Sequence, residues 1–425
     1  MILRAKRLIA RVIRSILLRG VRAPAREQHL AGADRRLYIF LWSAWGMGGT
    51  IRAAFNLAEY LTERAWEVEL VSGIRNRDEP FFGEFPAGVR VSDLDDRRPG
   101  AVRFPRSLVR AVLSRLPSVL MPSADRAAAG FNVWTDLQLV RKFRGRAGFV
   151  MGTRPGVNLM LARLQAPGLP TIGLEQMNLS KHNRALRTSM KRLYPKLAAL
   201  VVLTEQDREA YARLLKGKAP PLHVIPNTVR PLPGAKADLA AKTVYAAGRF
   251  RYQKGFELLI PAWAETAKAH PDWTLRLRGR GHLESRYRGL IEADGLDGSV
   301  TLEDPAEDIG SDMAAASVFV LSSRFEGFPL ILLEAMSKGM GVVSFDCPTG
   351  PADIIDDHRN GLLVPHEDVA ALARAIREIV EDEALRRRMA EAAIETAQQY
   401  TIEAIGPRWV ELLEGLSPAS RPSPA

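Results

Sequence analysis

Two glutamates stand on either side of a predicted turn, at positions where both could touch one small ligand. Glu326 and Glu334 are separated by seven residues, and Gly327 and Pro329 between them favour a turn that leads into a helix. The free N–H groups at the start of such a helix attract an anion, typically a phosphate. Because hydroxyl groups are natural partners for the two carboxylates, this pattern predicts a site for a sugar nucleotide.

The elements that would position these glutamates can be identified in the sequence. Residues 318–321 form a short, apolar and largely β-branched run, which is typical of a buried strand. Residues 330–336 are good helix formers, and Pro329 suits the first turn of a helix because its missing N–H has no partner there. The sequence therefore predicts a strand, a tight turn and a helix.

A second stretch of the same half carries two cations in a glycine-bounded loop. A strand predicted over residues 243–247 runs into Gly248 and Arg249, and Lys254 and Gly255 precede a helix predicted over residues 256–269. Arg249 can fork onto two phosphate oxygens, and Lys254 adds a point charge. These two cations could balance a leaving pyrophosphate without a metal ion.

A glycine-rich loop near the start of the chain is a second candidate for a loop whose backbone amides bind the ligand. A strand predicted over residues 37–42 is followed by Gly48, Gly49 and Arg52, and then by a helix pattern. Strand, glycine loop and helix open a nucleotide-type βαβ unit, in which glycines let backbone amides approach a ligand closely. The lysine of a P-loop and the third glycine of a dinucleotide fingerprint are missing.

Polar clusters follow two further predicted strands, over residues 149–152 and 171–174. Arg154 follows the first strand, and Glu175 and Gln176 follow the second. In open α/β sheets ligands bind outside the carboxyl ends of the strands, so these side chains are candidates for binding an acceptor. His182 lies in the loop beyond them, where we expect a surface residue.

These segments together resemble a known enzyme family between about residues 37 and 409. Glu326 and Glu334, within a Ser-x-x-Glu-Gly-Phe-Pro context, look like the E-x7-E motif of retaining glycosyltransferases. Residues 48–52, 224–227, 248–255 and 360–364 are similar to four other signatures of glycosyltransferase family 4, also called group 1. This group includes bacterial polysaccharide, glycolipid and teichoic-acid transferases. It often carries a histidine where this chain has Gln176, which cannot titrate.

The resemblance implies an α/β protein of GT-B type, with two Rossmann-like domains facing across a cleft. It implies transfer of a sugar from a nucleoside diphosphate, such as UDP, to a hydroxyl of a cell-envelope glycan, glycolipid or teichoic-acid-type acceptor, with retention and without a metal or other cofactor. The residues expected to act in catalysis are Glu326, Arg249 and Lys254. Those expected to bind the donor are Gly48, Gly49, Asn227, Gly248, Phe328, Pro329, Leu330, Ile331 and Glu334. Those expected to bind the acceptor are Arg52, Arg154, Glu175 and Gln176.

A metal-binding alternative starts from Asp93 and Asp95, whose Asp-x-Asp spacing other glycosyltransferases use to hold a cation. We expect the two aspartates to follow a short strand over residues 89–91 and to lie in a charge-rich loop, where acidic pairs are common. The sequence therefore favours a metal-free site.

The sequence and the resemblance together divide the chain into four segments. Composition indicates a basic amphipathic segment over residues 1–32 and a disordered tail over residues 417–425. The resemblance implies an acceptor domain over residues 33–230 and a nucleotide-sugar domain over residues 231–416, whose last helix could pack back on the first. The first segment has no acidic residue before Glu27, and as a helix it would have one apolar face and one basic face. This pattern suits either a solvated tail or an interfacial helix on anionic lipid. Residues 97–130 are expected to form a mobile or loosely helical insert facing the acceptor or the membrane.

Composition limits the remaining alternatives. The net charge is +12, and the single cysteine, Cys347, excludes an internal disulfide and favours a reducing compartment. No apolar run approaches the roughly 18 residues that a transmembrane helix needs, so a cytoplasmic protein, peripheral on the inner face of the plasma membrane, is expected. Two alternatives remain: a sugar-nucleotide epimerase of the same fold, and a basic protein that binds membrane or nucleic acid. The sequence has no nucleic-acid motif, so nucleic acid is not an expected partner.

Overall fold

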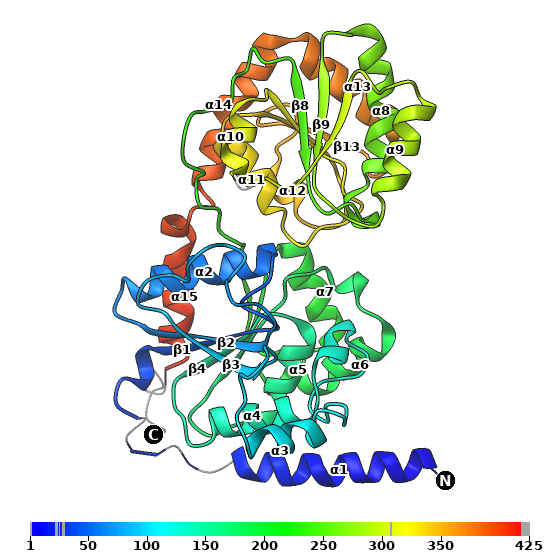
Figure 1. Ribbon diagram of the computed structural model, residues 1–425. Helices are drawn as coiled ribbons and strands as arrows, with labels where there is room; N and C mark the ends of the chain where they lie inside the picture. The colour runs from blue at the N-terminus through cyan, green and yellow to red at the C-terminus, as the bar shows by residue number, and fades with distance from the viewer. Residues whose placement is uncertain (1, 22–23, 25, 28–29, 307, 418–425) are drawn as a thin grey trace. The chain divides into compact units, whose positions relative to one another are not determined.

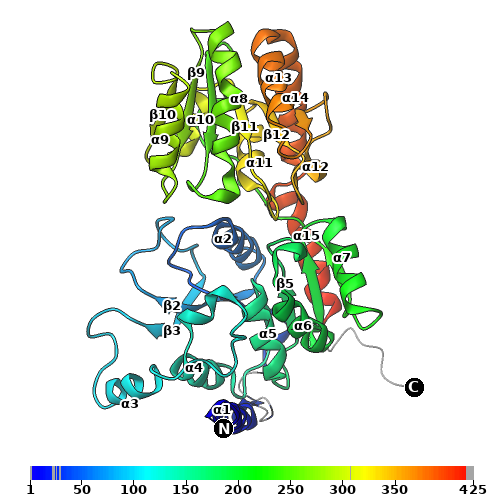
Figure 2. The ribbon, with the colours of Figure 1, turned by 90° about the vertical axis from the view of Figure 1, so that its right-hand side faces the viewer.

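The computed structural model describes residues 2–21, 24, 26–27, 30–306 and 308–417, and within them the chain folds as two compact α/β units. Residues 1–225 and 406–425 make up the first unit, and residues 226–405 make up the second. Each unit is a parallel sheet with helices on both faces (Figures 1 and 2). The predicted fold class, two Rossmann-like α/β domains, is confirmed.

The sheet of the first unit has seven parallel strands in the order β3-β2-β1-β4-β5-β6-β7. The strands are β1 (Arg36–Leu41), β2 (Glu67–Arg75), β3 (Arg90–Asp96), β4 (Phe149–Gly152), β5 (Thr171–Leu174), β6 (Ala199–Val202) and β7 (Leu222–Val224). The order reverses between β1 and β4, so the loops that follow these two strands flank the topological switch point, where such sheets bind ligands.

The helices of the first unit include one at each end of the chain. They are α1 (Ile2–Val21), α2 (Gly49–Thr62), α3 (Arg106–Leu113), α4 (Val133–Phe143), α5 (Pro155–Leu164), α6 (Arg184–Leu193), α7 (Glu205–Leu215) and most of α15 (Ile402–Gly415). Short 3-10 helices are η2 (Ala33–Arg35), η3 (Arg126–Gly130), η4 (Leu179–Lys181) and η5 (Tyr194–Lys196). No helix within the described ranges is long and apolar enough to cross a membrane.

The second unit repeats the same winding with six parallel strands in the order β10-β9-β8-β11-β12-β13. The strands are β8 (Thr243–Ala247), β9 (Thr274–Arg278), β10 (Val300–Glu303), β11 (Val318–Leu321), β12 (Gly341–Phe345) and β13 (Leu362–Val364). The helices are η6 (Tyr252–Lys254), α8 (Phe256–Ala269), α9 (Glu284–Ala293), α10 (Ile309–Ala314), α11 (Leu330–Ser337), α12 (Pro351–Ile354), α13 (Val369–Glu381) and α14 (Glu383–Gln398). Here the strand order reverses between β8 and β11.

The central strands are buried on both faces, which explains why they read as continuous apolar runs in the sequence. All four residues of β6 and all four of β11 are buried. In the second unit the core includes Trp263 of α8, which is fully buried, and Ile376 of α13, also fully buried. These strands form a rigid platform, and the loops at their carboxyl ends carry the polar residues.

One prediction about local structure is wrong, and the structure adds detail to two other stretches. Asp93 and Asp95 lie on β3 rather than after it, because the pairing of β3 with β2 continues through Ile74 and Asp95 to the end of the strand. The helical stretch after β13 divides into two helices, α13 and α14, because Asp382 adopts an extended conformation and caps the second. The insert at 97–130 contains ordered elements, α3 and η3; of the predicted disordered tail, residues 418–425 lie outside the described residues.

Candidate active site

Glu326 lies in the turn between β11 and α11, and its carboxylate is held by three side chains. Lys254 Nζ donates to Glu326 Oε1 at 2.8 Å, and Ser323 Oγ donates to the same oxygen at 2.6 Å. Gln253 Nε2 faces Oε2 at 3.4 Å. Glu326 is only 7% exposed, so these contacts compensate for the loss of water around its charge.

The loop that carries Lys254 follows β8, which pairs directly with β11. The two loops therefore meet at the switch point of the second unit. Gly248 leaves room for the lysine, because a Cβ there would lie 2.9 Å from the Lys254 side chain. Gly255 has φ +64° and its Cβ would lie 2.2 Å from the Ser322 carbonyl oxygen, so only glycine fits at this crossing.

Arg249 occupies the same loop but differs from Lys254 in its pairing. Its side chain is exposed and forms no hydrogen bond or ion pair with any other described residue. Desolvation lowers the pKa of Arg249, the neighbouring Arg251 lowers it further, and Glu326 opposes both effects. The guanidinium is thus a cation whose charged form an anion would stabilise.

Arg324, within the same turn, has a structural role that the sequence did not reveal. Its guanidinium donates to Glu257 Oε1 of α8 at 2.7 Å and to the Tyr252 carbonyl at 3.0 Å, and it pairs with Glu367 at 2.7 Å. Arg324 therefore ties the turn after β11 to the loop after β8. Gln253 and Ser323 were also missed as partners of Glu326; their only sequence signal is their adjacency to Lys254 and Glu326.

The start of α11 leaves backbone groups available beside this turn. Pro329 is the N-cap residue and no side chain caps the helix, so the first N–H groups of α11 have no intrahelical partner. Gly350, at φ +100°, lets the loop after β12 pass close by, because a Cβ there would lie 2.6 Å from the Pro329 ring. Thr349 Oγ1 also donates to the Glu326 carbonyl at 2.9 Å, which fixes the turn.

The remaining donor candidates divide between the two units. Glu334 lies on α11 and is 5% exposed, and Asn227, at the start of the second unit, is 7% exposed. Gly48 and Gly49 belong to the first unit, where Gly48 is the N-cap residue of α2 with φ 156° and no side chain caps that helix. The structure brings Arg249, Lys254, Glu326 and the start of α11 into one edge of the second unit.

Glu175, an acceptor candidate at the carboxyl end of β5, is buried in a polar cluster of its own. It is 2% exposed and accepts hydrogen bonds from Asn158 Nδ2 at 2.7 Å and from the Tyr194 hydroxyl. His182 Nε2 lies 3.6 Å from Glu175 Oε2, with its side chain 10% exposed. The expectation that His182 is a surface residue is therefore wrong, because its loop folds back over β5.

The other acceptor candidates are also engaged within the first unit. Arg154, before α5, pairs with Asp125 at 2.9 Å. Arg52 of α2 stacks over the ring of Phe82, with its guanidinium carbon 4.8 Å from the ring centroid. Gln176 is 9% exposed. These side chains come from α2 and from the loops after β4 and β5.

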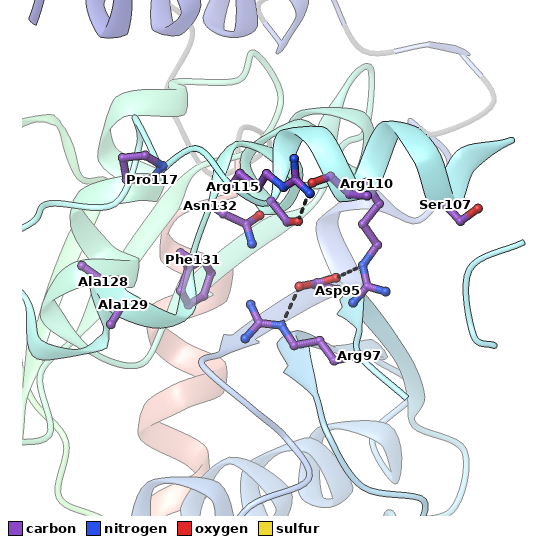
Figure 3. Close-up of a pocket in the computed structure, with 12 residues that line it drawn as sticks. Asp95, Arg97, Ser107, Arg110, Arg115, Pro117, Ala128, Ala129, Phe131 and Asn132 are labelled. Atoms are coloured by element: carbon purple, nitrogen blue, oxygen red, sulfur yellow. Dashed lines mark hydrogen bonds and ion pairs between the residues drawn. The ribbon is translucent and has the colours of Figure 1, made fainter. Parts of the chain in front are cut away.

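The Asp-x-Asp pair is satisfied by neighbouring donors. Asp93 accepts from Trp45 Nε1 at 2.7 Å, while burial raises the pKa of Asp93 against the effects of Trp45 and Arg75. Asp95 pairs with Arg97 at 2.7 Å and with Arg110 at 2.9 Å (Figure 3). Across the described parts of the chain, no group of three or more His, Cys, Asp or Glu side chains could hold a metal ion.

Comparison with known families shows that both halves of the chain match glycosyltransferase domains. Residues 48–228 match the glycosyl transferase 4-like domain, and residues 235–396 match glycosyl transferases group 1. The strand order, the paired carboxylate and lysine, and the uncapped helix described above lie within these matched regions. The chain belongs to the group 1 glycosyltransferases, as the sequence motifs predicted.

Two relatives illustrate where this similarity extends. An exopolysaccharide phosphotransferase of Streptomyces coelicolor is 34% identical over 381 residues, which are 88% of this chain but only 40% of that protein. The chain therefore spans less than half of that relative. The amylovoran biosynthesis glycosyltransferase AmsD of Erwinia amylovora is 25% identical over 386 residues, which are 89% of this chain and 99% of that protein.

Solved structures show the same fold. A crystal structure of a variant of S. aureus TarM, in complex with fondaparinux, alpha-GlcNAc-glycerol and UDP, superposes with a TM-score of 0.72 over 89% of this chain and 99% of that one. The two sequences are 15% identical, so this similarity concerns the GT-B fold alone.

Proposed function

We propose that this enzyme transfers a sugar from a UDP-sugar to a hydroxyl group of a cell-envelope glycan, glycolipid or teichoic-acid-type acceptor, with retention at the anomeric carbon and without a metal ion. The observation that supports this most is the arrangement at the switch point of the second unit. There a paired lysine and carboxylate, Lys254 and Glu326, lie beside the uncapped helix α11 and beside Arg249, a cation with no side-chain partner among the described residues.

The proposed roles follow from charge and geometry. Arg249, Lys254 and the N–H groups of Phe328, Leu330 and Ile331 bind the diphosphate and stabilise the charge that grows on it as it leaves. Gly248 gives this loop close access, and Pro329 and Leu330 set the start of the helix. Glu326 accepts from a donor-sugar hydroxyl, and Glu334 accepts from the ribose hydroxyls; Asn227, Gly48 and Gly49 complete the donor site.

The bond changes balance within one face of the sugar. The bond between the anomeric carbon and the β-phosphate oxygen breaks, and a bond from that carbon to the acceptor oxygen forms. The acceptor proton passes to the departing phosphate oxygen, so UDP is released and no other base is required. Positive charge that develops on the ring faces Glu326, whose position is fixed by Lys254 and Ser323.

The proposed acceptor rests on the first unit and on the relatives. Arg52, Arg154, Glu175 and Gln176 would contact or position it from α2 and from the loops after β4 and β5. One relative is named for exopolysaccharide and another for amylovoran biosynthesis, and the TarM complex contains UDP, which supports an envelope glycan as acceptor and UDP as nucleotide. A cytoplasmic location, with the N-terminal helix α1 on an anionic membrane and no nucleic acid partner, completes the proposal.

Released UDP provides the test. The purified protein is incubated with individual UDP- and GDP-sugars, with and without a lipid-linked or glycan acceptor, and the nucleoside diphosphate is quantified. We expect release with a UDP-sugar, an unchanged rate in EDTA, and an α-linked product from an α-linked donor by NMR. A β-linked product would overturn retention. Inhibition by EDTA that Mn²⁺ reverses would overturn the metal-free site and return attention to Asp93 and Asp95.

A further inference from the structure

Helix α3 presents an apolar face that no described residue of its unit covers. None of its residues is buried. Leu108 is 60% exposed and Val112 is 62% exposed, and their spacing of four residues places them on one side of the helix. Phe104 just before the helix is 77% exposed, and Leu116 just after it is 43% exposed. Single exposed apolar residues are ordinary, but a contiguous group marks an interaction surface.

The surroundings of this face are uniformly basic. Between residues 97 and 124 the chain has six arginines and no acidic residue. Arg97, Arg98 and Arg110 pair with aspartates of β3. Arg103, Arg106 and Arg115 are exposed and form no ion pair with another described residue. The apolar face is therefore flanked by three cations that are free to meet an anion.

The inner side of α3 explains why its apolar residues point outward. Arg110 attaches the helix to Asp95, and a hollow of about 620 Å³ opens between α3 and the segment that includes Ala128 and Phe131 (Figure 3). The helix is thus held by an ion pair rather than by a packed core. Substitutions of Leu108 and Val112 should therefore cost the fold little.

Helix α1 contributes a second strip of the same character. Val12 is 52% exposed and Ile16 is 64% exposed, next to the exposed Arg11 and Arg19. The opposite side of α1 packs in the core of the first unit through Val21, which is fully buried. Both α1 and α3 contact α4, and both lie at the same end of this unit in Figures 1 and 2.

We propose that α3, together with the exposed strip of α1, forms a docking surface for an anionic lipid bilayer. Leu108, Val112 and Phe104 enter the boundary between headgroups and acyl chains, and Arg103, Arg106 and Arg115 bind lipid phosphates. A second copy of the chain fits this surface poorly, because a symmetric dimer would turn the same free arginines toward one another. The proposal extends the membrane contact beyond α1 and needs no assumption about the sugar or the acceptor.

Point variants of the full chain test the surface better than removal of α1, because Val21 belongs to the core. The probe is sedimentation with vesicles of phosphatidylcholine, with and without phosphatidylglycerol. We expect wild-type protein to bind only the anionic vesicles. Leu108→Gln combined with Val112→Gln should lower the partition coefficient about tenfold, because the inserted apolar area is lost. Arg103→Gln combined with Arg106→Gln should lower it roughly twentyfold, since each arginine near such a surface contributes about a factor of five.

Matched controls separate the surface from general effects of charge and hydrophobicity. Arg374→Gln with Arg388→Gln removes the same charge from exposed positions on α13 and α14, and Phe81→Gln removes another exposed apolar side chain. Both controls should bind like wild type. All variants should keep the wild-type melting temperature and the same release of UDP from donor in the absence of vesicles.

Three results would overturn the proposal. The first is wild-type protein that stays in the supernatant with anionic vesicles. The second is binding that the α3 variants lose no more than the controls do. The third is a wild-type dimer, measured by light scattering, that the Leu108 and Val112 variant converts to a monomer, since a second copy would then cover this face. None of these results depends on transferase activity, so a failure of the sugar-transfer proposal would remain distinguishable.

Discussion

Both α/β units place charged side chains at the carboxyl ends of their parallel strands, but they use them differently. In the second unit Arg249 is exposed and unpaired within the described residues, beside the Lys254–Glu326 pair and an uncapped helix. In the first unit Glu175 is enclosed by Asn158, Tyr194 and His182. The same winding thus supports one edge that can receive an anion and one whose charged and polar side chains are enclosed and face each other.

This difference teaches that a polar cluster after a strand does not by itself indicate a ligand site. Arg154 is a fair candidate by position, yet its guanidinium pairs with Asp125 at 2.9 Å. The distinguishing feature is whether the charge is already compensated. A ligand must displace the existing partner of a charge that is already compensated, whereas it adds a favourable contact to a charge that is not.

The strongest way to break the comparison is to remove the unpaired cation. Arg249→Ala should lower kcat by about a hundredfold, because charge on the leaving phosphate grows in the transition state and a donor to such a charge contributes about 3 kcal/mol. Arg249→Lys should restore part of the rate, since a point charge replaces a fork. Arg288→Ala, on the exposed surface of α9, is the matched control and should behave like wild type. An Arg249→Ala enzyme with wild-type kcat would refute the anion site.

The pH dependence of stability tests whether a buried carboxylate of the first unit serves the fold rather than a ligand. Asp136 of α4 is fully buried and accepts from Ser118 Oγ and from the Val119 and Leu120 amides, and burial raises the pKa of Asp136 to about 6. The folded-state pKa of Asp136 lies above the unfolded value of 3.8, so the folded state binds the proton more tightly than the unfolded state does. The contribution of protonated Asp136 to the free energy of unfolding is therefore complete below pH 3.8 and is lost as pH rises through about 6.

The loss amounts to about 3 kcal/mol of unfolding free energy across that interval. Asp136→Asn should remove this pH dependence, whereas Asp297→Asn, at an exposed position of the second unit, should retain it. Urea unfolding of the three proteins between about pH 4 and pH 7 provides the measurement. Parallel curves for wild type and Asp136→Asn would contradict the assignment.

The same substitution made in each unit sharpens the comparison further. Glu175→Gln should lower the unfolding free energy by about 2 kcal/mol, because it disturbs a buried hydrogen-bonded network, while changing kcat less than tenfold. Glu326→Gln should show the reverse order: a clear loss in kcat and a smaller loss in stability. Thermal unfolding and steady-state kinetics on both variants decide between these outcomes. If Glu175→Gln were the more damaging to kcat, the first unit would hold the more sensitive catalytic carboxylate.

The smallest expected effect concerns the donor. Glu334→Ala should raise KM for the UDP-sugar roughly tenfold with little change in kcat, because ribose contacts are equally present in the ground and transition states. Glu383→Ala, on the exposed first turn of α14, serves as the control. A KM equal to wild type would remove Glu334 from the donor site.

The sequence by itself determined the local elements and the motifs that carry the second unit. The β8 and β11 strands, the helix α8, and the glycine loops were predicted with the observed bounds or nearly so, because burial on both faces produces continuous apolar runs and glycine or proline ends them. The family followed from the same short patterns, since their residues are adjacent in the chain.

The tertiary structure alone decided which charges meet. Lys254 and Glu326 are 72 residues apart in the chain and become partners only because β8 pairs with β11. Arg324 and Glu257 likewise meet across 67 residues of chain. Glu175 and His182 are close in the chain, but only the folding of their loop over β5 brings the ring, which the sequence suggested would be exposed, against the carboxylate. The apolar face of α3 is exposed because no described element packs against it, and the spacing of apolar residues in the sequence cannot show whether such a neighbour exists. Pairings between distant residues follow from strand order and burial, so they lie beyond any local pattern of residue types.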